Sequence, residues 1–145
     1  MAAFQRGDYA SAVQILRPRA MQGNPNAEHN LGYLYTRGLG VPRDPVLAAS
    51  WYRKSAEQGF AASQAELGRM YFQGAGVPRD PIEGYKWLIL AGRESPAARQ
   101  YMQVASRMIS YDQMSEATRR AQLWTPKKPA PPVQTAAPPV RRKSP

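Results

Sequence analysis

The chain has 145 residues, of which 43% are hydrophobic and 10% aromatic, and it contains no cysteine. This length indicates one domain, and the composition allows a sizeable buried core. The lack of cysteine excludes a disulfide framework and a thiolate metal site, and no apolar run approaches the roughly 18 residues of a membrane-spanning helix.

The net charge of +10 is unevenly distributed. Residues 1–124 hold fifteen Lys and Arg and all ten Asp and Glu, which gives +5. Residues 125–145 hold five further cations and no acid, so the other +5 lies in this short segment. The first part is therefore mildly basic and the end of the chain strongly so.

The first segments indicate part of a helical unit. Residues 1–6 are typical of the last turn of a helix and lack the apolar core of a secretory signal. Asp8 is the expected N-cap of a helix over residues 9–22, and Gly23 is its expected stop. This helix is the second of a pair whose first helix is missing or nearly so. Either the chain starts here, or Met1 is internal to a longer product.

A long stretch of the chain occurs twice. Residues 31–45 and residues 67–81 are identical at ten of fifteen positions, thirty-six residues apart. A fixed period of this size indicates a repeat array in which each unit packs against its neighbours. The spacing predicts helices over residues 24–38 and 44–59, and again over residues 61–73 and 81–92, with an Asp-Pro pair opening each second helix.

The pattern fails after residue 95, as expected of a repeat that closes the open end of an array. Ser95-Pro96 opens one further helix, and Ser110 with Gln113 resembles a capping box that starts a last helix to about residue 124. Tyr101, Met102, Met108, Ile109 and Met114 are expected to pack these helices together. From residue 125 onward the Pro-rich, basic composition predicts a disordered tail.

The repeated positions resemble the Sel-1-like repeat, a helix-turn-helix relative of the tetratricopeptide repeat. The resemblance covers about residues 4–95 and rests on these positions of the first copy and their counterparts in the second: Ala27, Leu31, Gly32, Tyr35, Gly38, Gly40, Val41, Asp44, Ala48, Trp51, Ser55, Ala56 and Gly59. The second copy departs at Gly84, Gly92 and Ser95, which is expected to weaken its packing.

This resemblance implies an all-α fold, a right-handed α–α superhelix that binds proteins or peptides on its concave surface. It implies an adaptor or scaffold with no enzymatic activity, no cofactor and no small-molecule substrate, and it favours the cell envelope over the cytoplasm. The expected repeat domain covers residues 1–124 and consists of a partial repeat (1–23), two repeats (24–59 and 60–95) and capping helices (96–124). A tail over residues 125–145 is expected to follow it.

The candidate binding residues lie opposite the expected core face of each first helix. Ala27, Leu31 and Tyr35 share one face, so residues at the i, i+3 and i+7 positions of the other side form a stripe. First helices line the inner wall of such superhelices. The candidates are Asn30, Tyr33, Arg37, Glu66, Arg69 and Gln73. The alternative is an ordinary solvated face.

Other notable residues have structural interpretations. His29 is the only histidine and has no partner at metal-ligand spacing, so it is expected on a helix surface. Asp44 and Asp80 are expected to cap helices, and Trp51 and Trp87 to pack the repeats. The glycine pairs of the loops lack the sequence context of phosphate loops. Trp124 either seals the final helix or contacts a partner.

The tail supports a second hypothesis. Its cations, Lys127, Lys128 and residues 141–143, would attract nucleic acid or an anionic membrane by weak, salt-sensitive contacts. Its proline spacing also fits a ligand for an aromatic groove on a partner.

Overall fold

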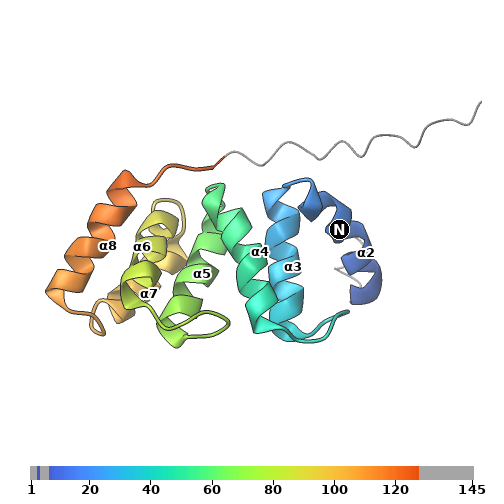
Figure 1. Ribbon diagram of the computed structural model, residues 1–145, viewed down its shortest axis with the longest axis horizontal. Helices are drawn as coiled ribbons and strands as arrows, with labels where there is room; N and C mark the ends of the chain where they lie inside the picture. The colour runs from blue at the N-terminus through green and yellow to red at the C-terminus, as the bar shows by residue number, and fades with distance from the viewer. Residues whose placement is uncertain (1–2, 4–6, 128–145) are drawn as a thin grey trace, which may run out of the picture.

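The structure, a computed structural model, describes residue 3 and residues 7–127. Within these residues it is all-α, with helices packed as successive helix-turn-helix pairs (Figure 1). The helices are α2 (Tyr9–Met21), α3 (Pro25–Arg37), α4 (Pro45–Glu57), α5 (Ala61–Gln73), α6 (Pro81–Gly92), α7 (Pro96–Ala105) and α8 (Tyr111–Leu123). The expected helices are confirmed to within one or two residues. The helical turn expected for residues 1–6 lies outside the described residues apart from Ala3, which is helical. Of the tail expected over residues 125–145, the structure describes residues 125–127 alone.

Side-chain caps fix where most of these helices begin. The carboxylate of Asp44 accepts a hydrogen bond from the backbone N–H of Leu47, and Asp80 accepts one from Glu83, each at 3.1 Å. A cap of this kind satisfies one of the N–H groups that a helix start leaves without a partner. The expected caps are confirmed at Asp8, Asn24, Asp44, Asp80, Ser95 and Ser110, the last in a full capping box.

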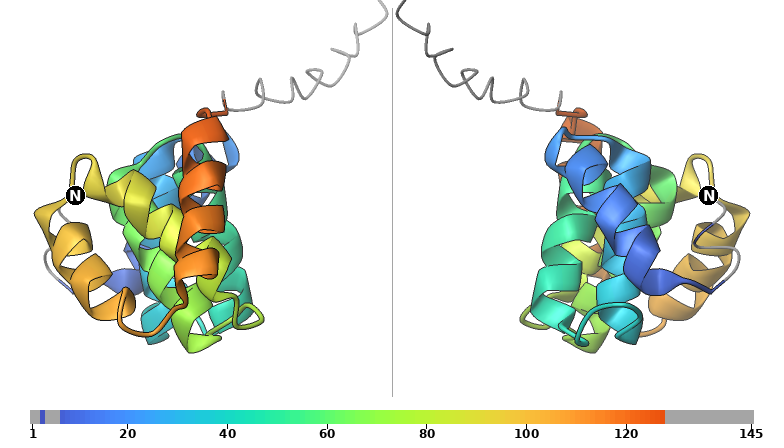
Figure 2. Two further views of the ribbon diagram at one scale, coloured as in Figure 1. Left: turned by 90° about the vertical axis from the view of Figure 1, so that its left-hand side faces the viewer. Right: turned by 90° about the vertical axis from the view of Figure 1, so that its right-hand side faces the viewer.

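Each helix from α2 to α6 packs against the next one, and α8 packs against α6, so the core lies between first and second helices (Figure 2). Leu31, Leu34 and Leu67 of the first helices are fully buried, as are Ala48 and Ala56 of α4. Small residues on the second helices let the backbones approach closely. Burying each leucine contributes roughly 1.5–3 kcal/mol, so stacking of neighbours supplies the stability that a lone hairpin lacks.

Each glycine loop connects the two helices of one repeat and packs against the preceding repeat. A Cβ on Gly76 would lie 2.1 Å from the carbonyl oxygen of Pro45, and one on Gly40 would lie 2.5 Å from the carbonyl of Tyr9. Both glycines have positive φ angles of 72°. Each loop therefore lies against the start of the preceding second helix at a distance that excludes any side chain.

Gly84 does not weaken the second repeat, contrary to the sequence-based expectation. A Cβ at this position would lie 2.8 Å from the ring of Phe72, which is buried. Phe72 stands where the first repeat has Thr36, and Gly84 where the first repeat has Ala48. The larger side chain on α5 is matched by a smaller one on α6, which preserves the close packing of the helix pair.

The last helices close the array. The ring of Tyr101 lies edge-on to Phe72 with centroids 6.3 Å apart, and Ala117 and Ala121 of α8 are buried against α6. Met108 is 55% exposed, so its predicted packing role is wrong. The exposed residues of α8 include the polar Ser115, Arg119 and Gln122, with Tyr111 and Leu123 exposed at its two ends. No helix among residues 7–127 combines the length and apolarity needed to cross a bilayer.

Candidate functional site

Two of the predicted binding residues line a groove between the first helices α5 and α7. Glu66 and Arg69 form an ion pair at its rim, and both side chains are partly exposed. The floor is apolar and includes the buried Leu88, with Tyr101 of α7 on the far wall. We call this space the α5–α7 groove; its volume is about 230 Å³. It has an apolar floor, an aromatic wall and charges at its mouth.

The other four candidates lie outside this groove. Asn30 lines a separate hollow of about 180 Å³ between α2 and α3, and its amide donates to Asn26 Oδ1 at 3.2 Å. The guanidinium of Arg37 lies 5.5 Å from the ring centroid of Tyr33 on the same helix. Gln73 is exposed at the end of α5. The six residues therefore belong to the first helices as expected but do not share one cavity.

A polar cluster lies beneath the first helices, where the first repeat meets the second. The side chain of Glu28 is only 3% exposed. The amide of Gln58 donates to Glu28 Oε1 at 2.6 Å and to the carbonyl oxygen of Gly23 at 3.0 Å. The amide group of Gln58, at the end of α4, thus donates to two acceptors, one on α3 and one on the turn between α2 and α3.

His29 takes part in the same junction and is not a surface residue, so that expectation is wrong. Its Nδ1 lies 2.8 Å from the hydroxyl of Ser63, which donates to Ser55 Oγ at 2.7 Å. The imidazole is half-buried, 5.3 Å from the ring centroids of both Tyr52 and Phe60. This arrangement holds α3, α4 and α5 together, and no metal-binding group of three or more His, Asp or Glu occurs in the described part of the chain.

Burial shifts the acidity of these two neighbours in opposite directions. Burial raises the pKa of Glu28 from 4.5 to about 7, against the opposing effect of the Lys54 charge and the Gln58 hydrogen bond. Burial also lowers the pKa of His29, which favours the neutral imidazole. Both residues therefore favour the uncharged form inside the junction.

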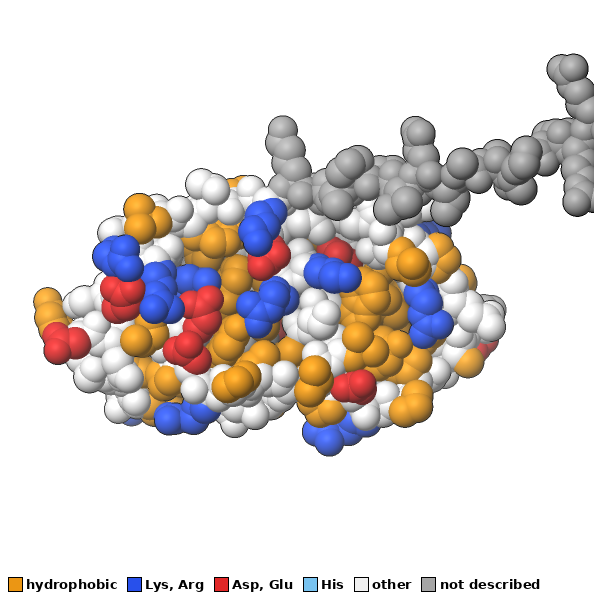
Figure 3. Space-filling model, viewed as in Figure 1, with side chains coloured by type: hydrophobic (Ala, Val, Ile, Leu, Met, Phe, Trp, Pro, Cys, Tyr) orange, Lys and Arg blue, Asp and Glu red, His pale blue; other side chains and the backbone are white. Residues whose placement is uncertain are grey.

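The face of the molecule shown in Figure 3 carries charges of both signs. Over α6 and α8, Glu83 pairs with Lys86 and Arg120, and Glu116 pairs with Arg119 and Arg120. The two arginines lower the pKa of Glu116 to about 2. Because basic side chains are interleaved with acidic ones, this part of the face does not present a purely positive surface.

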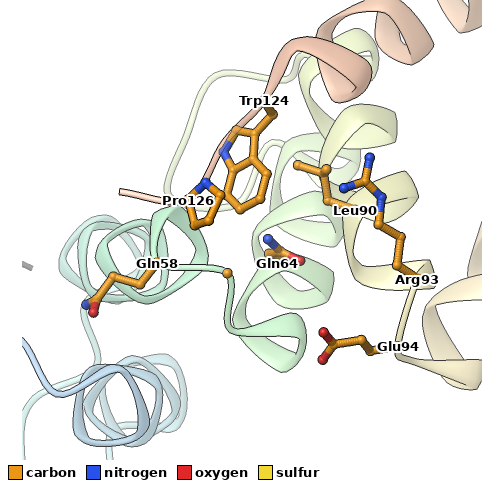
Figure 4. Close-up of a pocket in the computed structure, with 8 residues that line it drawn as sticks. Gln58, Gln64, Leu90, Arg93, Glu94, Trp124 and Pro126 are labelled. Carbon is orange, nitrogen blue, oxygen red and sulfur yellow. The ribbon is translucent and has the colours of Figure 1, made fainter. Parts of the chain in front are cut away.

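A further cavity lies at one edge of the array, where the segment after α8 crosses back over the helix ends (Figure 4). The ring of Trp124 lies 6.1 Å from that of Trp87, and the backbone N–H of Lys127 donates to the carbonyl of Glu57 at 2.7 Å. We call this space the edge cavity; its volume is about 340 Å³. It is lined by Gln58, Gly59, Gln64, Leu90, Arg93, Glu94, Trp124 and Pro126.

The tryptophans largely follow their predicted roles. Trp87 is 2% exposed and Trp51 is half-buried within the repeat core. Lysines lie over both rings, with Lys54 Nζ 4.5 Å from the centroid of Trp51 and Lys86 Nζ 4.3 Å from that of Trp87. Trp124 packs on Trp87, which is one of the two roles that the sequence left open for it.

Comparison with known families agrees with this geometry. The family model described as the Sel1 repeat matches residues 25–60 and again residues 61–96, which are the two hairpins α3–α4 and α5–α6 with their turns. The chain belongs to the Sel1 repeat family. Sel1 repeats are helical repeats related to the tetratricopeptide repeat, and the family is generally non-catalytic. A search among curated proteins finds no match.

Solved structures share the Sel1-repeat fold. One is c5321 from uropathogenic Escherichia coli, a protective antigen with an SLR fold, at 29% identity and a TM-score of 0.78. Another is a Sel1 repeat protein from Oxalobacter formigenes, at 32% identity and a TM-score of 0.69. Each comparison covers 83% of this chain, which spans 27% of the first protein and 52% of the second.

Proposed function

We propose that this Sel1-repeat chain is a non-catalytic interaction module that binds a segment of a partner protein along its first helices, on the concave side. The observation that carries the proposal is the α5–α7 groove. Its floor of Leu88 and Ala98 is apolar, whereas Glu66 and Arg69 at the rim are polar. Binding sites in proteins commonly combine an apolar depression with a few polar groups that orient the ligand.

Residue type supports the same surface. Tyrosine and arginine are enriched among residues that dominate interface energies, and Tyr101, Arg69, Tyr33 and Arg37 all lie on first helices. Arg37 already lies near the ring of Tyr33, so this pair offers a partner a pre-arranged cationic and aromatic surface. A partner segment that places an apolar side chain in the groove would meet Arg69 of α5 on one side and Tyr101 of α7 on the other.

A selection of displayed peptides against the intact chain tests this proposal. Peptides selected on the wild-type chain are expected to lose binding to a Tyr33→Ala, Arg69→Ala double variant, with helicity unchanged. The matched control is Tyr111→Ala, Arg119→Ala, which removes the same residue types from the exposed surface of α8. Binding that survives the first double variant and fails in the second would place the site elsewhere and refute the proposal.

The alternative is an anionic ligand, nucleic acid or an anionic membrane, held by the basic tail. Lys127, the one tail cation among the described residues, has its Nζ 3.4 Å from Glu57 Oε1. Lys128 and residues 141–143 lie outside the described residues. Deleting residues 125–145 separates the two functions, because a concave-surface binder retains its peptide whereas a tail-dependent binder loses its salt-sensitive ligand.

A further inference from the structure

The edge cavity lies away from the α5–α7 groove, at the position one repeat after the polar cluster of Gly23, Glu28 and Gln58. We call the position of that cluster the first junction and the position of the cavity the second junction. The turn between α4 and α5, the turn between α6 and α7, and residues 124–127 meet around it (Figure 4). Its chemistry can be read by comparing it with the equivalent position one repeat earlier. Binding at this cavity is independent of the function proposed for the concave surface.

The first junction is closed by a side chain of the protein itself. There, the amide of Gln58 donates to both Glu28 and the carbonyl of Gly23. The two acceptors are thus satisfied by one NH₂ group, as buried acceptors in folded proteins generally are.

The second junction has the acceptors without the donor. Thirty-six residues on, Gln64 replaces Glu28, Gly59 replaces Gly23, and Glu94 replaces Gln58. A carboxylate has no N–H to donate, so Glu94 cannot repeat the role of Gln58. The next first helix also begins one residue earlier, since α7 begins at Pro96, the counterpart of Phe60, whereas α5 begins at Ala61. A cavity is left where the first junction is closed.

Three groups of the cavity wall determine what it can hold. Gln64 is 2% exposed, and because its Nε2 donates to the carbonyl of Ala56 at 3.2 Å, its Oε1 is left as an acceptor. Figure 4 shows this amide at the centre of the ring of lining residues, with the indole of Trp124 above it and the carboxylate of Glu94 below. Arg93 also lines the cavity, and its Nη2 lies 3.5 Å from the carbonyl of Ala121 on α8.

We propose that the edge cavity binds the charged end of a lysine or arginine side chain presented by a partner protein. Its N–H groups would donate to Gln64 Oε1 and to the carboxylate of Glu94, and hydrogen bonds between charged groups are the stronger ones. The ring of Trp124 would meet the cation on its face. A ligand without N–H groups could donate neither to Gln64 Oε1 nor to the carboxylate of Glu94.

Nuclear magnetic resonance of the ¹⁵N-labelled full chain tests this site with a small probe. Nα-acetyl-arginine amide is expected to produce saturable shifts of the Trp124 indole N–H and the Gln64 side-chain amide. Nα-acetyl-citrulline amide has nearly the same shape without the charge, and its binding is expected to be at least about tenfold weaker. Equal affinity for the two probes, or no saturable shift at these two groups, would overturn the proposal.

Variants locate the binding on the chain. Glu94→Gln is expected to weaken binding of the arginine probe about tenfold. Asp112→Asn makes the same change in net charge at an exposed position on α8 and is expected to leave it unchanged. The Tyr33→Ala, Arg69→Ala variant should also bind the probe normally. Loss of binding in either of these two controls, or retention in Glu94→Gln, contradicts the assignment.

Discussion

Replacing Glu28 with glutamine is expected to stabilise the fold at pH 8 and to leave its stability nearly unchanged at pH 5. The side chain is buried, and Gln58 donates to its Oε1. Glutamine retains an oxygen at that position, so the hydrogen bond survives the substitution while the buried charge is removed. The second repeat already has a buried glutamine, Gln64, at the equivalent place.

The direction follows from proton binding. The pKa of Glu28 is raised from 4.5 to about 7 in the folded chain, so between these values the folded state holds the proton and the unfolded state has lost it. The contribution of Glu28 to stability therefore falls as pH rises from about 4.5 to about 7 and is then constant. The full shift corresponds to about 3 kcal/mol, and a gap of about 1–3 kcal/mol between variant and wild type is expected at pH 8.

Urea unfolding followed by far-ultraviolet circular dichroism, at intervals from pH 5 to pH 8, measures this gap. His29 acts in the opposite sense, since its lowered pKa costs stability as pH falls below 6.5. That contribution is present in both proteins and cancels in their difference. Asp112→Asn, which removes an exposed carboxylate on α8, is the control and should show no comparable gap. Parallel pH profiles for wild type and Glu28→Gln would refute the reasoning.

Two further predictions concern packing between helices, both measured by urea unfolding. Gly84→Ala is expected to cost about 1–3 kcal/mol because its Cβ would meet the ring of Phe72 and the carbonyl oxygen of Gly68. The cost is expected to be smaller when Phe72→Thr restores the pairing of the first repeat, and equal costs in both backgrounds would contradict this coupling. Gly76→Ala is expected to destabilise more than Gly74→Ala. Both have positive φ angles, but the nearest atom to a Cβ on Gly74 is Arg79 Cβ at 3.3 Å, whereas Gly76 faces the Pro45 carbonyl at 2.1 Å. Equal losses would show that the φ angle alone, and not the contact between repeats, requires glycine.

The helices and their order were predictable because their signals are local. An Asp-Pro pair caps and starts a helix whatever lies around it, and a glycine with positive φ ends one in the same way. Repetition of these signals at Asp44 and Asp80 then indicates a stacked array without further information. Cap positions and helix bounds are therefore the part of the structure that the sequence specified most closely.

Burial at the repeat junction was not predictable from one helix alone. Glu28 and His29 follow each other on α3, and a helical wheel of α3 shows only its strongest apolar face. The two side chains are buried because α4 and α5 approach from another direction and supply Gln58 and Ser63. Likewise, the α5–α7 groove depends on the distance between two helices, and the hydrophobic periodicity of either helix alone does not predict that distance.

Comparison of the two copies, position by position, does carry some of this information, because facing residues change together. Thr36 and Ala48 become Phe72 and Gly84, a pair of opposite changes in size that keeps α5 against α6.

Glu28 and Gln58 become Gln64 and Glu94, which exchanges the carboxylate and the amide but places no donor where Gln58 had one. The first exchange preserves packing, so it signals structure alone. The second does not preserve packing, because it leaves the buried amide of Gln64 and the exposed carboxylate of Glu94 at the wall of an open cavity. An uncompensated exchange between repeats is therefore the feature of this sequence that points most directly to a ligand.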